Sequence, residues 1–255
     1  MSNGQIKGFN PEQTAERIVQ WIKDYFKENA AENTKAVIGI SGGKDSSVAA
    51  ALCVKALGRE RVYGVLMPKG EQADIDCSYQ LVNHLGIDHC VINIGETADA
   101  FFKALNAGGI GINAQAEINT PPRIRMAVLY AVAASKGGRV INTCNLSEDY
   151  VGYSTKFGDS AGDMSPLSDL TVAEVIAVGD ALGLPYELTH KVPIDGLCGK
   201  TDEDNLGFTY AELDSYIRGG AEALADKPEL IEKIERMHRN NLHKLRLMPK
   251  FEMQI

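Results

Sequence analysis

A glycine-rich turn that contains an aspartate is the part of the sequence that points most directly to chemistry. Residues 36–50 read AVIGISGGKDSSVAA, an apolar run, then the turn, then a helical pattern. Glycines allow positive φ and close approach of the backbone to a ligand, and a helix start attracts anions. Asp45 would repel a bare phosphate, so its position predicts a Mg²⁺ ion between the carboxylate and phosphate oxygens.

This turn differs from the nucleotide P-loop, G-x-x-x-x-G-K-[ST]. Asp45 stands where Ser or Thr must follow the lysine, and Ile38 stands where the first glycine belongs. A tight turn with a capping aspartate and no ligand is the alternative interpretation of such a turn taken alone. The strand-to-helix context, with Ser46 and Ser47 after the aspartate, favours an anion site.

The turn must be positioned by the elements around it, and these alternate along the chain. Four short apolar runs are typical of buried strands, namely KAVIGI, RVYGVLMP, HCVINI and RVINTCN. Helical patterns between them indicate βαβ units. These patterns cover residues 46–57, 72–85, 97–106, 122–135 and 171–182. We therefore predict a Rossmann-like α/β fold with a mostly parallel, five-stranded sheet and helices on both faces.

The ends of the chain are expected to be helical. Asn10-Pro11 is a capping residue followed by a proline, which predicts a helix over 11–28. A C-terminal helical segment is expected over 209–255, within a single domain that covers 1–255. Two polar stretches, 146–169 and 195–205, interrupt the alternation, and we expect them to be functional or mobile loops.

Composition excludes several classes of protein. The 255 residues carry a net charge of −8, which argues against a large nucleic-acid footprint. No apolar run is long enough to span a membrane, and the N-terminus lacks a signal-peptide pattern. Five scattered cysteines without a C-x-x-C pair indicate reduced thiols and a cytoplasmic protein.

The S-G-G-x-D-S turn after a first strand resembles the fingerprint of the PP-loop ATP pyrophosphatases. In that superfamily the loop holds the pyrophosphate of ATP while a substrate oxygen attacks the α-phosphate. The resemblance implies that the turn binds the leaving group and that Asp45 binds its magnesium ion.

Later segments resemble the NAD synthetases within that superfamily, in the same order along nearly the whole chain. They are PPRIRM at 121–126, NTCNLSEDYVGYSTKFGDSAGDMSPL at 142–167, KTDEDNLGFTYAELDSYI at 200–217 and HKLRLMP at 243–249. The T-K-F-G-D block is the most specific of them. This family joins ATP, deamido-NAD and ammonia. The nicotinate carboxylate is adenylated, and ammonia then displaces AMP to give NAD.

The family's functional residues map onto matching positions of this chain. The resemblance implies that Asp45 and Glu148 are magnesium ligands, and we expect Lys44, inside the loop, to be a further catalytic residue. The implied ATP contacts are Gly39, Ile40, Ser41, Gly42, Gly43, Lys44, Asp45, Ser46 and Thr143. The implied deamido-NAD contacts are Arg123, Lys156, Asp163, His243 and Lys244. Arg125 is either a further anion contact or an exposed helix arginine.

Two positions depart from the family pattern. Val172 stands where many members carry a lysine that contacts ATP phosphate, and Ile194 stands at a threonine position. Lys44, inside the loop, is positioned to supply the missing cation. That hypothesis would be wrong if Lys44→Ala left the affinity for ATP unchanged.

The nitrogen source and the assembly follow from the same resemblance. Only 35 residues precede the first strand, too few for the glutaminase domain of glutamine-dependent relatives, so free ammonia is expected. The resemblance also implies a homodimer. An apolar face on the helix after Arg123 is compatible with a dimer contact and equally with a core position: Met126, Leu129, Tyr130, Ala133 and Ala134.

Two rival functions remain at this point. One is another PP-loop ligase, such as a tRNA-modifying enzyme, which the acidic charge, the lack of cysteine pairs and the T-K-F-G-D block disfavour. The other is a nucleotide-sensing module without catalysis on the same scaffold. The departures at Val172 and Ile194 keep this second alternative open, and bound Mg-ATP without pyrophosphate release would support it.

Overall fold

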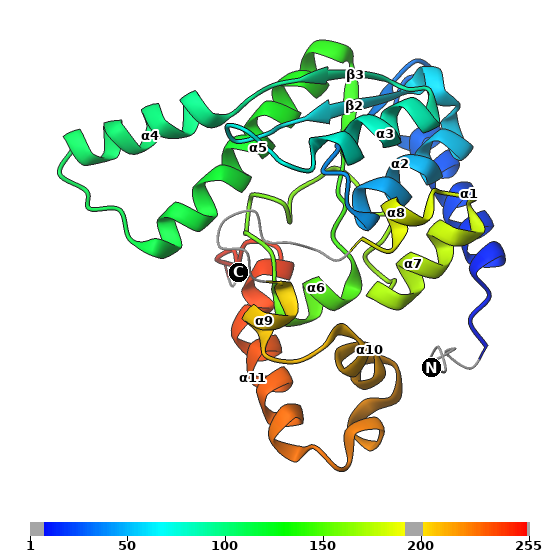
Figure 1. The fold of residues 1–255 in the computed structure, drawn as a ribbon, viewed down its shortest axis with the longest axis vertical. Coiled ribbons are helices and arrows are strands. Elements are labelled where there is room, and N and C mark those ends of the chain that lie inside the picture. Colours follow the sequence, from blue (N-terminus) through cyan, green and yellow to red (C-terminus); the bar gives the residue numbers. More distant parts are fainter. Residues whose placement is uncertain (1–7, 192–200, 254–255) are drawn as a thin grey trace.

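A parallel sheet forms the centre of the computed structural model, which describes residues 8–191 and 201–253 (Figure 1). Its strands are β1 (Lys35–Gly39), β2 (Val62–Leu66), β3 (Asp88–Val91) and β4 (Gly138–Ile141). Their order is β3-β2-β1-β4, and all neighbours pair in parallel. The chain therefore changes direction across the sheet between β1 and β4, which is where open α/β sheets bind ligands.

The prediction of five strands is wrong for the residues that the structure describes, which form four. Beside β4, Met164 makes only an isolated parallel bridge to Ile141. Gly162 and Pro166 flank this position. Proline has no N–H to donate to a ladder, and glycine weakens a strand, so the pairing does not extend into a fifth strand.

Helices cover both faces of the sheet, as predicted. They are α1 (Pro11–Asn29), α2 (Lys44–Leu57), α3 (Ile75–Leu85), α4 (Gly95–Ala107), α5 (Ala114–Lys136), α6 (Leu146–Val151), α7 (Val172–Ala181), α8 (Tyr186–Thr189), α9 (Asp202–Leu206), α10 (Tyr210–Gly219) and α11 (Pro228–Leu245). Short 3-10 turns lie at Arg59–Arg61 and Gly220–Leu224. None of the helices in the described ranges is long and apolar enough to cross a membrane.

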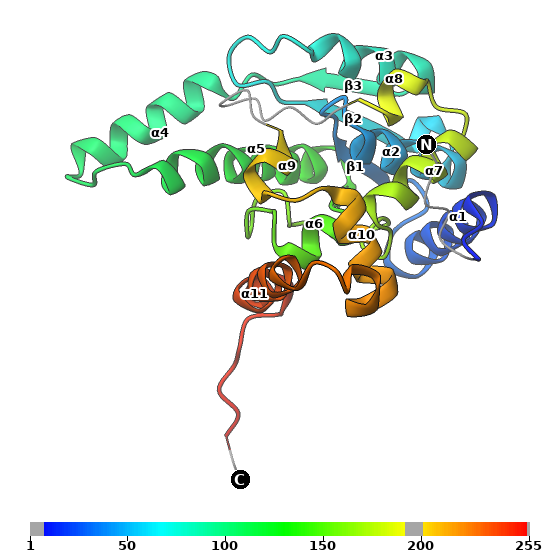
Figure 2. The same cartoon turned by 60° about the horizontal axis from the view of Figure 1, so that its bottom comes forward.

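Three apolar clusters hold these layers together. One packs α1, α2, α3, α7 and α8 on one face of the sheet, and a second packs α5 on the other. A third cluster lies outside the sheet and joins α6, α9, α10 and α11. Figure 2 shows α10 and α11 of this group below α2 and α5. It is therefore able to bring residues from the end of the chain to the edge of the sheet.

Helix α1 confirms the predicted start. Asn10 Oδ1 accepts a hydrogen bond of 2.8 Å from the backbone N–H of Gln13, and Pro11 occupies the first helical position. The helix buries Ala15, Val19, Ile22 and Phe26 at the spacing that the sequence predicts.

Helix α5 begins eight residues earlier than predicted, at Ala114 instead of Pro122. The Asn113 side chain caps it, and Thr120 Oγ1 bonds back to the Ala116 carbonyl at 2.7 Å, so the helix continues through Pro121 and Pro122. Prolines are rare inside helices because they lack an N–H, so the sequence pattern predicts a start at Pro122, which the cap at Asn113 overrides. With α4, the early part of α5 forms an arm that projects from the sheet (Figure 1).

The structure shows a helix in each of the two predicted loops and a definite end of the C-terminal helices. The 146–169 stretch opens with α6, and 202–206 forms α9, while residues 192–200, which include Ile194, lie outside the described residues. The C-terminal helices end at Leu245, not at the chain end, and the described residues after it are extended (Figure 2).

Candidate active site

The glycine turn lies at the end of β1 and runs directly into α2. Gly42 has φ +75°, and a Cβ there would lie 2.8 Å from both Cys77 Cβ and the Ser78 backbone nitrogen. Only glycine fits this position without moving α3. Gly39, one residue before Ile40, also packs closely, since a Cβ would meet the Met67 side chain at 3.2 Å.

Serine hydroxyls fix the shape of the turn. Ser41 Oγ lies 3.1 Å from Ser46 Oγ and accepts from the Gly43 N–H at 3.3 Å. Ser46 and Ser47 both donate to the Gly43 carbonyl, at 3.1 and 2.8 Å. Gly43 is the N-cap of α2, and no side chain caps this helix start within the described chain. The first-turn amides therefore point toward a position where an anion can bind.

Lys44 and Asp45 are the first two residues of α2 and form an ion pair. Lys44 Nζ lies 2.9 Å from Asp45 Oδ2, and the lysine side chain is only 5% exposed. Burial by itself would lower the pKa of Lys44, but the Asp45 and Glu148 carboxylates outweigh it, so the pKa is raised and the ammonium stays charged.

Glu148 is brought to the same place by α6, which follows β4. Asn145 caps α6 by accepting from the Glu148 N–H at 3.0 Å, and its own N–H donates to Glu148 Oε2 at 3.3 Å. Burial raises the pKa of the Glu148 carboxyl well above its usual range. The Asp45 carboxylate raises it further, and Lys44 opposes both. Asp45 and Glu148 are thus close enough to repel each other.

Asn145 is a site residue that our sequence reasoning missed. It is fully buried, and its Nδ2 donates to Asp45 Oδ1 at 2.9 Å while its Oδ1 caps α6. One side chain therefore connects the ends of β1 and β4. The signal was present as N-x-x-E at 145–148, the spacing of a capping box.

The C-terminal helices close this cluster from the other side. Tyr210, at the start of α10, is buried, and its ring centroid lies 5.7 Å from Lys44 Nζ. Its hydroxyl lies 3.4 Å from Asp202 Oδ2, and the Asp202 charge also contributes to the raised pKa of Lys44. Sequence reasoning did not select Tyr210 or Asp202, although both lie inside the quoted KTDEDNLGFTY block.

The residues expected to bind the second substrate gather around a different loop, residues 152–163. Arg123 Nε donates to the Lys156 carbonyl at 3.2 Å, and Lys156 Nζ donates to the His243 carbonyl at 2.7 Å. Lys244 Nζ donates to the carbonyls of Gly152 and Ser154, at 2.6 and 3.0 Å. Helix α11 is therefore tied to the loop by two lysines.

Phe157, within the T-K-F-G-D block, carries an unusual backbone. It has φ +62° and is 64% exposed, the only non-glycine residue with positive φ in the described ranges. An exposed aromatic residue held in this conformation is costly, and such strain often accompanies a binding function. Lys156 Nζ lies 5.3 Å from the centroid of its ring.

Asp163 and Lys244 line one polar cavity of about 310 Å³, together with Asn142, Asp149, Ser160 and other residues of the loop. Asp163 Oδ2 accepts from the Val140 N–H at 2.7 Å, so this carboxylate is partly used to hold the edge of β4. Burial raises the pKa of Asp149 to about 6, and the nearby Asp159 contributes in the same direction.

Helix α6 connects the two groups of residues. Asn145 and Glu148 face the Asp45 cluster, while Asp149 lines the polar cavity. Thr143 lies between β4 and α6, partly buried, at the carboxyl edge of the sheet. Arg125 is half-buried and donates to the Met67 carbonyl at 3.0 Å, so it supports the end of β2 and is not an exposed arginine.

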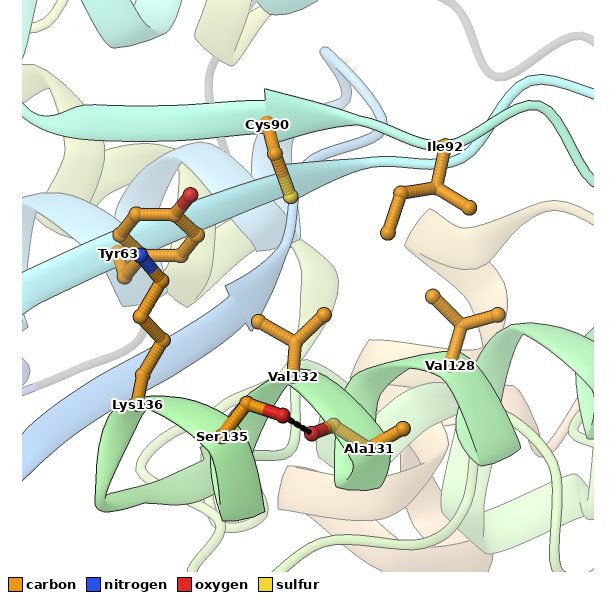
Figure 3. Close-up of a pocket in the computed structure, with 8 residues that line it drawn as sticks. All are labelled: Tyr63, Cys90, Ile92, Val128, Ala131, Val132, Ser135 and Lys136. Carbon is orange, nitrogen blue, oxygen red and sulfur yellow. Dashed lines mark hydrogen bonds between the residues drawn. The ribbon is translucent and has the colours of Figure 1, made fainter.

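A second hollow lies elsewhere and contains none of the predicted site residues. Figure 3 shows it between β2, β3 and α5, with a volume of about 320 Å³ and mainly apolar walls. Lys136 Nζ lies 4.7 Å from the centroid of the Tyr63 ring at one end. It is separate from the carboxyl edge of the sheet where the charged residues meet.

Comparison with known proteins agrees with this arrangement. The profile of the NAD synthase family matches residues 14–249. The chain belongs to this family. The NH3-dependent NAD+ synthetase of Pyrococcus furiosus is 36% identical over 243 residues, which cover 91% of this chain and 93% of that one.

Two solved structures are similar over almost the whole chain. NMN synthetase from Francisella tularensis has a TM-score of 0.85 at 34% identity, covering 96% of this chain and 100% of that chain. The NH3-dependent NAD synthetase of Campylobacter jejuni has a TM-score of 0.80 at 27% identity, with the same two coverages. The expected family and the α/β fold are thus confirmed.

The predicted magnesium site can be compared with the residues that the structure brings together. Among the described residues there is no group of three or more His, Cys, Asp or Glu side chains that could hold a metal ion. Asp45 and Glu148 nevertheless fit Mg²⁺, because this ion commonly uses one or two protein carboxylates and takes its other ligands from phosphate and water. Their mutual repulsion would be relieved by a cation between them.

Proposed function

We propose that this chain is a ligase that synthesises NAD+ from deamido-NAD, ATP and ammonia. The nicotinate carboxylate attacks the α-phosphorus of ATP, and pyrophosphate leaves. Ammonia then attacks the carbonyl carbon of the acyl-adenylate, loses a proton, and AMP leaves. The observation that carries this proposal is the meeting of Lys44, Asp45 and Glu148 at the ends of β1 and β4, in a chain of the NAD synthase family.

The turn from Gly39 to Ser46 would bind ATP. Its uncapped first-turn amides and the positive end of α2 suit the phosphates, and Gly42 lets the backbone approach them. Thr143, on the neighbouring strand end, would contact the same nucleotide. Because the reaction needs no protein nucleophile, positioning and electrostatic stabilisation account for catalysis.

Asp45 and Glu148 would hold Mg²⁺. When bound, the ion neutralises charge on the phosphate oxygens as pyrophosphate departs. The chain's own part is to hold the two carboxylates in place, which Asn145 does through its contacts with Asp45 and the Glu148 backbone.

Deamido-NAD would bind along the 152–163 loop and the end of α11. Arg123, Lys156 and Lys244 supply positive charge there, and each donates to a backbone carbonyl that holds it in place. His243 is exposed beside them, which favours a binding role over a catalytic one. Asp163 would contact the substrate from the polar cavity.

Amidation of the corresponding mononucleotide is a second candidate. The similarity to NMN synthetase, with a TM-score of 0.85 over 96% of this chain, is the specific observation that favours it. Both reactions would use the same carboxylate chemistry, so they differ only in how much of the substrate the site must hold.

We also propose a homodimer formed through the α4–α5 arm. This arm carries exposed apolar side chains, including Phe101, Ile110 and Ile118, and Tyr130 on α5 is 40% exposed. Of the predicted α5 face, Met126, Leu129 and Ala133 are buried against the sheet, whereas Tyr130 and Ala134 point outward. Light scattering after gel filtration tests this, and a monomer at assay concentration would contradict it.

A cytoplasmic location is part of the same proposal. Cys53, Cys77, Cys90 and Cys144 are all free thiols in the described chain. Unpaired thiols are typical of reducing compartments.

Pyrophosphate release is the direct test. The purified protein is incubated with Mg-ATP and either deamido-NAD or nicotinate mononucleotide, with ammonium or with glutamine. Pyrophosphate and NAD+ in equal amounts, with ammonium and deamido-NAD, are expected. A higher kcat/KM with the mononucleotide would favour the second candidate, and no pyrophosphate with either substrate would contradict both.

A further inference from the structure

Lys44 has an environment that a simple phosphate-binding lysine would not need. Its side chain is 5% exposed, although it belongs to the first turn of a helix that begins beside the ligand position. The ammonium does not extend into solvent but folds back to Asp45 Oδ2 at 2.9 Å. A buried lysine at this place must be stabilised by negative charge.

That negative charge comes from three separate parts of the chain. Asp45 belongs to α2, Glu148 to α6 and Asp202 to α9, and all three act on the Lys44 ammonium. The Tyr210 ring from α10 covers the ammonium at 5.7 Å. Lys44 is thus the cation around which the glycine turn, α6 and the C-terminal helices meet.

The same contacts occupy both oxygens of Asp45. Oδ1 accepts from Asn145 Nδ2, and Oδ2 accepts from Lys44 Nζ, both at 2.9 Å. Each oxygen keeps a free lone pair, but a divalent ion bound to this carboxylate would lie close to the Lys44 ammonium and be repelled by its charge, so the ion binds well only when the ammonium moves away. Asn145 is fully buried and also caps α6, whereas Lys44 has a long, flexible side chain that can move.

We propose that Lys44 is a resident counter-ion that keeps Asp45 and Glu148 from binding a divalent metal until nucleotide arrives, and that its ammonium then transfers from Asp45 to the triphosphate. This inference rests on the proposed function, because it assumes that ATP binds at the turn. The exchange keeps every charge paired. The metal replaces the ammonium at the carboxylates, and the ammonium meets the phosphate oxygens.

The order of binding follows from this exchange. Without nucleotide, a divalent ion must compete with a cation that is attached to the chain and cannot diffuse away. With nucleotide, the triphosphate offers Lys44 a new partner and the ion additional ligands. Metal and nucleotide should therefore bind together. In that complex the Lys44 ammonium contacts the triphosphate, and it replaces the cation that is missing at Val172.

Mn²⁺ binding without nucleotide tests the proposal, using the loss of the free Mn²⁺ electron paramagnetic resonance signal. Wild type is compared with Lys44→Met, which keeps an unbranched side chain one atom shorter and removes its charge. We expect Lys44→Met to bind Mn²⁺ at least tenfold more tightly than wild type. Adding Asp45→Asn to Lys44→Met should abolish the gain. Equal affinities of wild type and Lys44→Met, or a gain that persists without Asp45, would overturn the proposal.

A second measurement uses α,β-methylene ATP, which cannot be cleaved at the bond that the reaction breaks. Its affinity in the presence of Mn²⁺ should fall about tenfold in Lys44→Met, because the triphosphate has lost the ammonium. An unchanged affinity would overturn the transfer step. Lys44→Gln serves in both measurements if thermal unfolding shows that Lys44→Met does not fold.

These measurements need no turnover, so they separate this inference from the proposed function. Failure to form NAD+ with a tenfold Mn²⁺ difference would contradict the function and leave the counter-ion role standing. Normal NAD+ synthesis with equal Mn²⁺ affinities would overturn the role of Lys44 and leave the function standing.

Discussion

The two charged regions of this protein hold their lysines in opposite ways. In the Asp45 region, Lys44 meets carboxylates, and its charge is neutralised inside the protein. In the 152–163 loop region, Lys156 and Lys244 donate to backbone carbonyls, which hold the ammonium groups in place. A carbonyl is a dipole and carries no net charge, so neither ammonium is neutralised by the group that holds it, although Asp159 acts on Lys244 from nearby.

This difference indicates what each region can bind. The first region is a balanced cluster in which an added cation must replace an existing one. The second holds its cationic side chains in a geometry that is fixed before an anion arrives, which lowers the entropic cost of binding. The proposed reaction brings a metal–nucleotide complex and a large anionic substrate together, and the two regions match these two partners.

The comparison predicts that the largest loss follows from a change at Asp45. Asp45→Asn keeps the shape of the side chain and its contact with Asn145 but removes the charge. We expect kcat/KM for Mg-ATP to fall by about 1000-fold. NAD+ formation at saturating deamido-NAD measures this. Asp76→Asn, in the exposed first turn of α3, is the matched control and should stay near wild type. A loss below tenfold at Asp45 would break the comparison.

The next effect concerns the turn itself. Gly42→Ala forces a Cβ into a residue with φ +75° and to within 2.8 Å of Cys77 Cβ, so we expect destabilisation by about 3 kcal/mol. At Gly43, φ is −90° and the nearest atom, Ser41 Oγ, would lie 3.4 Å away, so Gly43→Ala should cost less than about 1 kcal/mol. Urea unfolding measures the free energy of unfolding of both variants, and equal losses would contradict the special backbone conformation and close packing of Gly42.

Asn145 offers a way to separate stability from positioning. Asn145→Ala removes the cap of α6 and the donor to Asp45, and should destabilise the protein by about 2 kcal/mol. Asn145→Ser keeps a capping hydroxyl but is too short to reach Asp45. We expect the serine variant to recover part of the stability but to keep a raised KM for Mg-ATP. If its KM returned to the wild-type value, Asn145 would be a cap only.

The smallest effect should appear in the loop region. Lys156→Met removes one of several cations, so we expect KM for deamido-NAD to rise about tenfold, equivalent to about 1.4 kcal/mol. KM for ATP should not change. Lys23→Met, on the exposed face of α1, is the control. An equal rise in both KM values would show that the two regions are not functionally separate.

Much of the fold followed from local patterns. The apolar runs predicted all four strands, and the Asn10-Pro11 pair predicted the start of α1. Two errors had local causes. The proline pair predicts a helix start at Pro122, inside the observed α5, and the predicted sheet has five strands, whereas the described residues form four strands and one isolated bridge at Met164. The start of α5 depends on the cap at Asn113, which lies outside the proline segment, and the number of strands depends on pairing between residues that are distant in sequence. A local pattern contains neither.

The sequence by itself predicted the glycine turn at the end of the first strand, the family, and most of the charged residues that the structure brings together. These depend on residue types at short spacing, which local rules describe. Only the tertiary structure decided which of them meet. It showed that Asn145 joins Asp45, that Tyr210 and Asp202 close over Lys44, and that carbonyls hold Lys156 and Lys244. These contacts join residues from 87 positions apart (Lys156 and His243) to far more than a hundred (Lys44 and Tyr210), and only the packing of α6, α10 and α11 at the sheet edge brings them together.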